Sequence, residues 1–452
     1  MFGRILVANR GEIAVRVIRT CRQLGIETVA VYSTADRDSL HVALADRAIC
    51  IGGPRAADSY LKMPAILSAA EVSGAEAIHP GFGFLSENAH FADICAKCNL
   101  GWIGPRAEVL RSMGDKAQAR HLMRSAGVPV TPGSEGVVPD PDAAVALART
   151  IGYPVLVKAI AGGGGKGMRV ARSDAELRSA FLTAAQEARQ AFGNGDCYLE
   201  KLVENARHVE VQLVADRHGN VYAIGERDCS LQRRHQKLLE ETPSPAVTPP
   251  LRRHLLQAAV RAGKACGLDS VATVEFLWDA SAQAFYFMEM NTRIQVEHPI
   301  TEEVTGLDLV EAQLRAAAGE ELSARDWDPR PAGHCLEVRL NAEDPARGFA
   351  PSPGRIRQLR WPGGPGVRVD SHAYVGYQIP PYYDSMIGKL VVRGRTRDEA
   401  IRRARRALSE LDIEGVATTA ELAAALLADS RFVRGAYDTA FLERFVAETL
   451  PS

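Results

Sequence analysis

The residues most able to do chemistry lie in one stretch, AFYFMEMNTRIQVEHP, at positions 284–299. Its first half is almost entirely aromatic or apolar, which is typical of a buried strand. Its second half crowds ionisable and amide side chains together: Glu289, Asn291, Arg293, Gln295, Glu297 and His298. Burying unpaired carboxylates beside a guanidinium is costly, so we expect a ligand to fill the space between them.

The types and spacing of these side chains favour a cation and a small anion. In an extended chain alternate residues project to one face, so the odd-numbered positions from Glu289 to Glu297 are expected to line a single surface. Carboxylate and amide oxygens suit a hard cation such as Mg²⁺, whereas the planar fork of Arg293 suits an oxyanion. A solvated charged edge strand is the alternative, but it does not explain the apolar run. We interpret the stretch as a metal and anion site.

A second carboxylate precedes this stretch at a useful spacing. Glu275 lies in the strand-like segment VATVEFLW at 271–278, and the segment 279–283 reads as a turn into the next strand. Such a strand pair would set Glu275 and Glu289 on adjacent strands. We interpret them as a divalent-metal pair that serves a nucleotide.

A glycine-rich loop, GGGGKGM at 162–168, lies between two predicted strands at 154–160 and 169–171. It formally satisfies GxGxxG, but no helix follows, and it lacks the residues of a Walker A loop. Four consecutive glycines carry an entropic cost that a plain turn, the alternative, seldom needs. We therefore expect the loop and its Lys166 to close over a polyphosphate, with Lys158 also within reach.

Composition excludes several classes of protein. The chain has 452 residues, which indicates two to four domains. Its 54 basic and 55 acidic residues give a net charge of −1, which argues against nucleic-acid or membrane-surface binding. No apolar run reaches the roughly 18 residues of a spanning helix, and the N-terminus lacks a signal-peptide core. Eight scattered cysteines fit reduced thiols and a cytoplasmic location.

The order of predicted elements indicates α/β and α+β architecture. Strands alternate with helices over residues 4–103, which predicts a doubly wound parallel sheet. Its first strand-to-helix turn, ANRGEIA, lacks the three glycines of a dinucleotide-binding fingerprint. Boundaries are predicted just ahead of the helix at 115–125 and within SARDWDPRPAG at 323–333, after which short strands and helices mix.

Several motifs together resemble one family. They are ANRGEIAVR, IHPGFGFLSENA, MGDKAQAR, YPVLVKAIAGGGGKGMRV, RHVEVQL, ERDCSLQRRHQKLLEE, FMEMNTRIQVEHPITEEVTG, EVRLNAEDP and PYYDSMIGKL. In this order they resemble the biotin carboxylases, which are ATP-grasp ligases, over essentially the full length. The resemblance implies an N-terminal α/β domain at 1–112, an ATP-grasp domain at 113–329 with a mobile glycine-rich lid subdomain at about 131–203, and a C-terminal α+β domain at 330–452.

The resemblance also implies site residues. The catalytic residues are Glu297 as general base, Lys237 and Arg293 at bicarbonate, and Arg339 facing biotin. The ATP and bicarbonate positions are Lys116, Lys158, Gly163, Gly164, Gly165, Lys166, Gly167, Met168, Glu200, Lys201, Leu202, His208, Gln232, His235, Leu277, Gln295 and Val296. The metal positions, for Mg²⁺ or Mn²⁺, are Glu275, Glu289 and Asn291.

The implied activity is the carboxylation of biotin by bicarbonate and ATP through carboxyphosphate. No Met-Lys-Met biotinylation motif occurs, so we expect the biotin on a separate carrier protein. Carboxyltransferase subunits and a second copy of the chain are the other expected partners. An acetyl-CoA carboxylase role is the leading interpretation; a propionyl-CoA, other acyl-CoA or pyruvate carboxylase, or a ligase for another acceptor, remains open.

Three departures from the family pattern stand out. Phe82 occupies a position where many members carry tyrosine, so any hydroxyl function there is lost. Lys166 replaces a frequent arginine, which keeps the charge but not the bidentate geometry. The segment TPSPA at 242–246 replaces the more usual run of alanine, proline and glycine.

Overall fold

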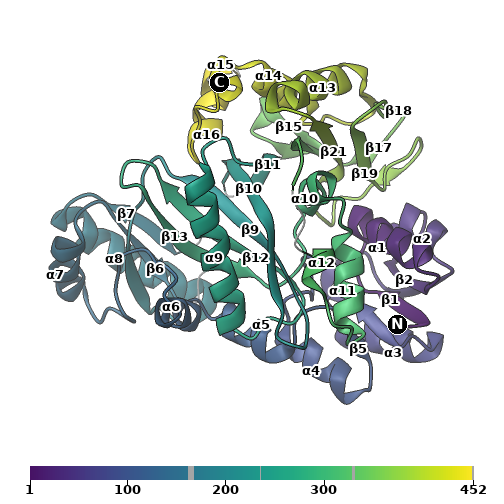
Figure 1. The fold of residues 1–452 in the computed structure, drawn as a ribbon, viewed down its shortest axis with the longest axis horizontal. Helices are drawn as coiled ribbons and strands as arrows, with labels where there is room; N and C mark the ends of the chain where they lie inside the picture. The colour runs from purple at the N-terminus through teal and green to yellow at the C-terminus, as the bar shows by residue number, and fades with distance from the viewer. Residues whose placement is uncertain (161–166, 235, 328–330, 450–452) are drawn as a thin grey trace.

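The computed structural model describes residues 1–160, 167–234, 236–327 and 331–449 (Figure 1). The chain forms an N-terminal parallel sheet, a small three-stranded sheet with two helices, and a large antiparallel sheet with further helices. This mixed architecture confirms the predicted fold class. No helix in these ranges combines the length and the apolar character needed to cross a membrane.

The N-terminal sheet is parallel throughout, in the order β3-β2-β1-β4-β5. Its strands are β1 (Arg4–Val7), β2 (Glu27–Ser33), β3 (Arg47–Gly52), β4 (Ala77–His79) and β5 (Gly101–Trp102). The helices of this part are α1 (Gly11–Gln23), α2 (Leu40–Leu44), α3 (Met63–Ser73), α4 (Ala89–Lys97) and α5 (Ala107–Gly114). Ile5, Leu6 and Val7 of β1 are fully buried, as the apolar run predicts for a central parallel strand.

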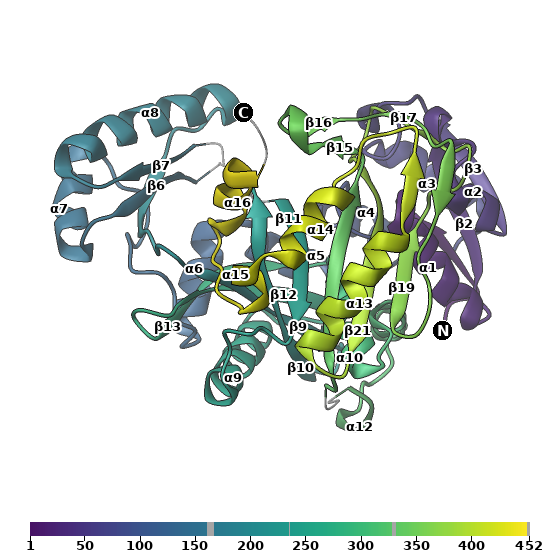
Figure 2. The same ribbon diagram turned by 90° about the horizontal axis from the view of Figure 1, so that it is seen from above.

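The small sheet has the order β7-β6-β8 and is antiparallel. It consists of β6 (Val155–Ala159), β7 (Met168–Ala171) and β8 (Cys197–Lys201), with α7 (Pro141–Ile151) and α8 (Asp174–Phe192). Helix α6 (Lys116–Ser125) leads into it. Figures 1 and 2 show that this body projects to one side of the molecule, away from the N-terminal sheet.

The large sheet is antiparallel and has eight strands in the order β13-β12-β9-β10-β11-β14-β21-β19. They are β9 (Arg207–Ala215), β10 (Val221–Arg233), β11 (Gln236–Thr242), β12 (Val271–Asp279), β13 (Ala284–Asn291), β14 (His334–Asn341), β19 (Val367–Ser371) and β21 (Met386–Gly394). Its helices in the middle of the chain are α9 (Pro249–Ala265), α10 (His298–Thr305), α11 (Leu309–Ala317) and α12 (Ala324–Trp327). Because β11 pairs with β14, one continuous sheet joins segments from both sides of position 330.

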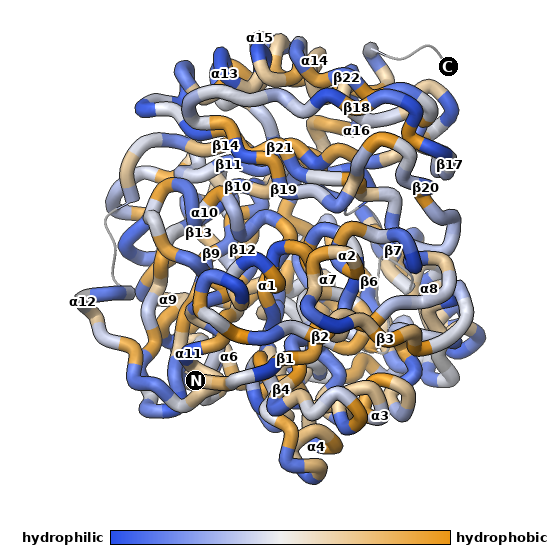
Figure 3. Tube along the Cα trace, turned by 90° about the vertical axis from the view of Figure 1, so that its right-hand side faces the viewer, coloured by the Kyte–Doolittle hydropathy of each residue, from blue (hydrophilic) through white to orange (hydrophobic). Residues whose placement is uncertain are grey.

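The C-terminal part completes this sheet and covers it with helices. They are α13 (Arg397–Glu410), α14 (Ala420–Ala428), α15 (Ser430–Val433) and α16 (Phe441–Thr449). Short strand pairs flank them: β15 (Glu343–Asp344) with β16 (Ala350–Pro351), β17 (Gly354–Arg355) with β20 (Gln378–Ile379), and β18 (Gln358–Arg360) with β22 (Asp412–Glu414). Figure 3 shows hydrophobic and hydrophilic segments alternating closely along these helices. Ala400 and Ala404 of α13 are fully buried, so one face packs on the sheet.

Candidate active site

The ammonium of Lys237, on β11, is the centre of a dense polar cluster. Its Nζ lies 2.5 Å from Glu297 Oε1, 2.7 Å from Glu210 Oε2, 3.2 Å from Glu275 Oε1 and 3.4 Å from Gln295 Oε1. Burial alone would lower the pKa of the ammonium, but its acidic neighbours raise this pKa well above normal. A permanently charged lysine therefore joins residues from β9, β11, β12 and the segment before α10.

Glu297 is fully buried, and its carboxylate lies between two cations. Oε1 contacts Lys237, and Oε2 lies 3.0 Å from Nη2 of Arg339 on β14. Burial alone would raise the pKa of Glu297, but Lys237, Arg339 and the nearby Arg227 hold it well below its usual range. The group is ionised at neutral pH, as a proton acceptor must be.

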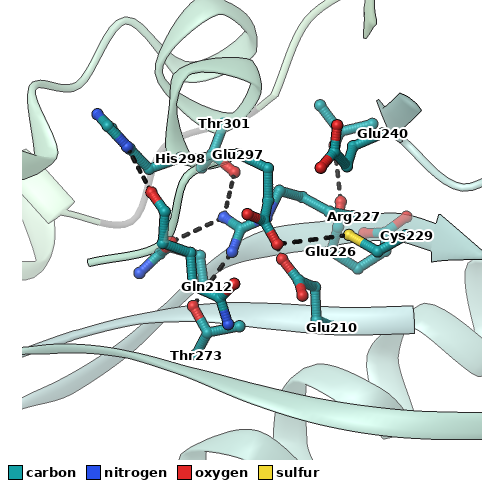
Figure 4. A network of polar contacts seen from close by, with 12 residues as sticks. Glu210, Gln212, Glu226, Arg227, Cys229, Glu240, Thr273, Glu297, His298 and Thr301 are labelled. Carbon is teal, nitrogen blue, oxygen red and sulfur yellow. Dashed lines mark hydrogen bonds and ion pairs between the residues drawn. The ribbon is translucent and has the colours of Figure 1, made fainter. Parts of the chain in front are cut away.

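A buried arginine supports this cluster from β10. Arg227 donates to Glu210 Oε1 at 2.6 Å, Gln212 Oε1 at 2.7 Å, Thr301 Oγ1 at 2.9 Å and Thr273 Oγ1 at 3.1 Å. Figure 4 shows its guanidinium among these side chains, next to Glu297. Because Glu210 bonds both Arg227 and Lys237, the arginine fixes the glutamate that in turn fixes the lysine.

The two carboxylates predicted on adjacent strands are direct neighbours. Glu275 of β12 lies opposite Glu289 of β13 in the antiparallel register. Oε1 of Glu275 accepts from Asn291 Nδ2 at 2.9 Å and from Gln295 Nε2 at 3.0 Å, and His208 Nε2 lies 3.1 Å from Oε2. Burial is the main cause that raises the pKa of Glu289, and the charge of Glu275 raises it further.

This arrangement fits a divalent cation. Burial alone would raise the pKa of Glu275, but Lys237 and His208 hold it below normal, so this carboxylate stays charged beside Glu289. A cation between two buried carboxylates would remove the repulsion that raises the pKa of Glu289. Carboxylate and amide oxygens are the donors that Mg²⁺ prefers, and Asn291 supplies the amide.

The chain does not stay extended through this stretch. β13 ends at Asn291, and the chain then bends at Arg293 and turns at Val296 and Glu297 before α10 begins. The predicted alternation up to Glu297 is therefore wrong beyond Asn291. Ile294 turns into the core and is fully buried, and Pro299 occupies the first turn of α10, where its ring favours a helix start.

Arg293 lies at this bend and is bound on two sides. Its Nε donates to Glu87 Oε2 at 3.0 Å and its Nη2 to Asn291 Oδ1 at 3.1 Å. Glu87 also accepts from the backbone of Thr292 at 3.2 Å. We call Glu275, Glu289 and Asn291 the metal-type donors. The arginine thus contacts one of them, Asn291, on one side and Glu87 of the N-terminal part of the chain on the other.

Another group of predicted residues lies on the three-stranded sheet. Lys158 of β6 contacts Glu200 of β8, and Arg120 of α6 contacts the same carboxylate. Met168 of β7 lies opposite Lys158 in the register. A phosphate arriving at Lys158 would compete with Glu200 for the ammonium.

Two neighbours of Glu200 are engaged through their polar groups. Lys201 donates from Nζ to the carbonyls of Gly152 at 3.0 Å and Tyr153 at 2.7 Å, so its charge serves the protein backbone. The amide of Leu202 donates to the carbonyl of Pro154 at 3.1 Å.

The glycine loop enters the described chain at Gly167. Its φ is +75°, and an added Cβ would meet Ala159 Cβ at 2.8 Å, so only glycine fits there. The remaining predicted loop residues Gly163, Gly164, Gly165 and Lys166, and also His235, lie outside the described residues.

Four further predicted residues surround the metal-type donors or the central lysine. Lys116 is the first residue of α6, and its charge partly opposes the rise that burial and Glu275 cause in the pKa of Glu289. His208 of β9 lies opposite Leu277 of β12, and Gln232 of β10 lies opposite Lys237 of β11. Burial alone would lower the pKa of His208, but Glu275 raises it above normal.

A cavity of about 400 Å³ opens beside the central cluster and is lined by residues from distant parts of the chain. Four predicted residues line it: Lys237, Arg293, Val296 and Arg339. Phe82 and Phe84 contribute from the N-terminal part, and Tyr382 and Tyr383 from the C-terminal part. The lining combines cationic and aromatic side chains, which suits a partly apolar ligand with a polar head.

The structure also adds residues that sequence reasoning did not select: Glu87, Arg120, Glu210, Arg227 and Glu240. A signal for Glu210 was present, because His208, Glu210 and Gln212 alternate with buried apolar residues along β9. That alternation is equally typical of a strand with one solvated face.

Three family descriptions match the chain in order. They are "Biotin carboxylase, N-terminal domain" at residues 1–110, "Carbamoyl-phosphate synthase L chain, ATP binding domain" at 115–325 and "Biotin carboxylase C-terminal domain" at 337–444. Biotin carboxylase 1 of Bacillus subtilis is 55% identical over 445 residues, which cover 98% of this chain and 99% of that protein.

Two solved structures are similar over nearly their whole length. The biotin carboxylase complex with β-γ-ATP from Campylobacter jejuni has a TM-score of 0.94 at 48% identity, covering 98% of this chain and 99% of that one. The biotin carboxylase domain dimer of 2-oxoglutarate carboxylase from Hydrogenobacter thermophilus, in complex with MgADP, ADP and bicarbonate, has a TM-score of 0.93 at 49% identity, covering 98% of each chain.

Proposed function

The chain belongs to the biotin carboxylase family, and we propose that it is an ATP-dependent ligase that transfers the carboxyl group of bicarbonate to biotin. The observation that carries the proposal is the contact of Glu297 with both Lys237 and Arg339 beside the cavity. An ionised carboxylate between two cations suits the binding and deprotonation of a small anion.

Glu297 is the proposed general base for bicarbonate. As a bicarbonate oxygen attacks the γ-phosphorus of ATP, Glu297 takes the bicarbonate proton, the bond to ADP breaks, and carboxyphosphate forms. Lys237 and Arg293 offset the negative charge, and Gln295 and Val296 complete the anion pocket. Bicarbonate competes with Glu297 for Lys237, so its arrival weakens the ion pair that depresses the pKa of the base.

The nucleotide is proposed to bind between the three-stranded sheet and the metal-type donors. Lys116, Lys158 and the loop residues Gly163, Gly164, Gly165, Lys166 and Gly167 would hold the phosphates. Glu200, Lys201 and Leu202 would hold the base through their backbone, with Met168, His208, Gln232, His235 and Leu277 around the nucleotide. Support comes from Lys158, whose ammonium pairs with Glu200, the one carboxylate in contact with it among the described residues, and a phosphate can replace that carboxylate.

Glu275, Glu289 and Asn291 are the proposed ligands of Mg²⁺ or Mn²⁺. The bound metal would supply charge neutralisation for the phosphate oxygens. The chain itself contributes the fixed register that keeps Glu275 opposite Glu289, and the amide of Asn291 that donates to Glu275.

Arg339 is proposed to face the biotin ureido oxygen in the cavity. Its side chain lines the cavity and contacts the carboxylates of Glu240 and Glu297. Biotin would arrive on a carrier protein, and carboxyltransferase subunits would use the product. A homodimer is proposed from the dimeric relative. A cytoplasmic location fits the eight cysteines, which all lie in the described chain as free thiols.

The test is ADP release from MgATP with and without bicarbonate and with and without free biotin. We expect biotin to increase ADP release only when bicarbonate is present. ADP release that is indifferent to biotin would favour a different carboxyl acceptor, and no release at all would contradict a ligase.

A second candidate function differs from the first only in the molecule that finally accepts the carboxyl group. An acetyl-CoA carboxylase role is the leading proposal, but one similar structure belongs to a 2-oxoglutarate carboxylase, so a 2-oxo acid acceptor has a specific observation in its favour. Reconstitution of the chain with purified carboxyltransferase subunits of each type, scored by transfer of labelled bicarbonate carbon, separates the two.

A further inference from the structure

Arg339 makes its closest contact with a carboxylate that the proposed reaction does not use. Its Nε donates to Glu240 Oε1 at 2.6 Å, and its Nη2 lies 2.5 Å from the same oxygen. The same Nη2 lies 3.0 Å from Oε2 of Glu297. One guanidinium thus bridges the proposed base and a second, fully buried glutamate on β11.

A third buried carboxyl group lies directly behind this bridge. Glu337 of β14 is opposite Glu240 of β11 in the antiparallel register, so the two side chains lie on one face as nearest cross-strand neighbours. Glu337 is fully buried. Within the described residues, neither of its carboxyl oxygens has a hydrogen-bond partner, and Glu240 Oε2 also lacks one.

The local charges do not balance if both groups are ionised. Lys389, fully buried on β21, is 3.1 Å from Glu12 Oε1 and 2.9 Å from the carbonyl of Val296, so its charge is shared with another acid. Arg339 is already shared between Glu240 and Glu297. A buried, unpaired carboxylate is too costly to persist, so a proton is the missing partner.

We propose that Glu240 and Glu337 share one proton and that this pair positions Arg339 for biotin, with Glu240 as its ionised partner and Glu337 as the neutral acid. The inference rests on the proposed function. A protonated Glu337 can donate to the open Oε2 of Glu240, which leaves Oε1 for the arginine. Glu240 then keeps the guanidinium from pairing with Glu297 alone, so the base and the arginine can act separately.

The electrostatics of the two groups agree with this assignment. Burial raises the pKa of Glu337 well above normal, with Lys389 opposing. Burial also raises the pKa of Glu240, to about 7, while Arg339 opposes. The charged or titratable groups that face the pair from the surrounding elements are Lys237, Cys229, Glu297, Arg339, Lys389 and Glu12.

Two isosteric variants of the full chain separate the members of the pair. Glu240→Gln removes the charge that holds Arg339, and we expect biotin-dependent ADP release to fall about tenfold to a hundredfold, the usual worth of a charged hydrogen bond, with a higher KM for biotin. ADP release without biotin should change less than about threefold, because Glu297 and Lys237 remain paired. Glu337→Gln copies a neutral acid, so its rates should stay within about twofold of wild type.

Infrared spectroscopy reads the proton directly. The wild type should show a carbonyl band of a protonated buried carboxyl group at pH 7 that shifts in D₂O and is lost in Glu337→Gln. Glu240→Asp, which keeps the charge but shortens the reach, should lose less biotin-dependent activity than Glu240→Gln. Circular dichroism would show whether Glu240→Gln folds. If it folds poorly, the biotin-dependent activity of Glu240→Asp still tests whether the charge of Glu240 holds Arg339.

The outcomes are separable. Unchanged biotin kinetics in a folded Glu240→Gln, an equal loss in Glu337→Gln, or a carboxyl band that persists in Glu337→Gln would each overturn the inference. If wild-type ADP release ignores biotin, the proposed function fails instead, and the infrared band still tests whether the pair holds a proton.

Discussion

Lys237 and Glu297 form an ion pair with 2.5 Å between Nζ and Oε1, and the glutamate is fully buried. The pair has opposite consequences for the free and the occupied site. In the free protein it depresses the pKa of Glu297, which stabilises the carboxylate but makes it a weak base. An anion that binds Lys237 relieves this effect, so substrate binding itself would strengthen the base.

Glu297→Gln should abolish bicarbonate-dependent ADP release and leave nucleotide binding intact. The amide keeps the shape of the side chain but cannot accept the bicarbonate proton, a loss of about a hundredfold or more. Turnover and the Kd of a fluorescent ATP analogue would be measured side by side. The matched control is Glu71→Gln, an exposed change on α3 that should behave as wild type. Normal turnover in Glu297→Gln would remove the base assignment.

Lys237→Gln should reduce turnover about a hundredfold or more, because a charge that neutralises the reacting anions is lost. Its residual activity should also have a shifted pH profile. Among the charges that lower the pKa of Glu297, that of Lys237 has the largest effect. Without it the pKa of Glu297 rises, and the acidic limb of the pH–activity profile moves to higher pH. Lys264→Gln, an exposed change on α9, is the control. An acidic limb that stays in place would show that Lys237 does not tune the base.

Arg339→Ala should impair biotin carboxylation more than bicarbonate-dependent ADP release. The guanidinium lines the cavity, whereas Glu297 keeps its contact with Lys237 when Arg339 is removed. The two rates would be measured from labelled carboxybiotin and from ADP in the same reaction. Equal losses of both rates would assign Arg339 to the phosphoryl-transfer step.

Removal of divalent metal should stop turnover reversibly, and Glu275→Gln should raise the Mg²⁺ concentration needed for half-maximal activity by about tenfold or more. The variant loses one of the two facing carboxylates, and with it the charge that raises the pKa of Glu289. Titration of the chelator-treated protein with Mg²⁺ and with Mn²⁺ gives the measurement. Glu421→Gln on α14 is the control, and an unchanged Mg²⁺ requirement would exclude Glu275 as a ligand.

Local pattern predicted much of the fold. The apolar run of β1, the alternation of strands and helices after it, and the hairpin that sets Glu275 opposite Glu289 all have short-range signals in the sequence. The pairing of β11 with β14 does not, because nearly a hundred residues separate them and nothing in either strand specifies the other. The sheet that carries Lys237 beside Arg339 is therefore a tertiary result.

The site could be predicted where its functional residues are close in sequence. It could not be predicted where tertiary packing decides whether a side chain is buried. The regular alternation from Glu289 to Glu297 fails after Asn291 because the buried Ile294 and the helix start at Pro299 redirect the chain. Arg227 could equally have been a solvated arginine of a hairpin. Only the packing of β9, β12 and α10 around it makes it the fully buried support of Glu210.

A buried ion pair in the N-terminal part links stability to pH. Asp36 is fully buried and bonds Arg10 through both oxygens at 2.7 and 2.8 Å, with Tyr60 donating at 2.7 Å. Burial would raise its pKa, but these bonds lower it to about 2. Because the folded-state pKa is depressed, the contribution of Asp36 is present above the unfolded value and is lost as pH falls through about 2. The difference between the unfolded and folded pKa values of Asp36 corresponds to about 2 kcal/mol of folding free energy.

Asp36→Asn should therefore lower the thermal midpoint at pH 7, because Arg10 is left as a buried charge without its carboxylate, a cost of about 3–5 kcal/mol. The gap from wild type should narrow as pH falls from 4 towards 2, since the wild type loses the same ion pair by protonation. Scanning calorimetry at several pH values gives the midpoints, with the exposed Asp38→Asn as the control. If the thermal midpoints of wild type and Asp36→Asn stay equally far apart down to pH 2, the Asp36–Arg10 pair does not contribute to the loss of stability in acid.

Arg10 also lines the cavity and stacks 4.4 Å over the Tyr383 ring, so the same variant should weaken biotin binding at pH 7.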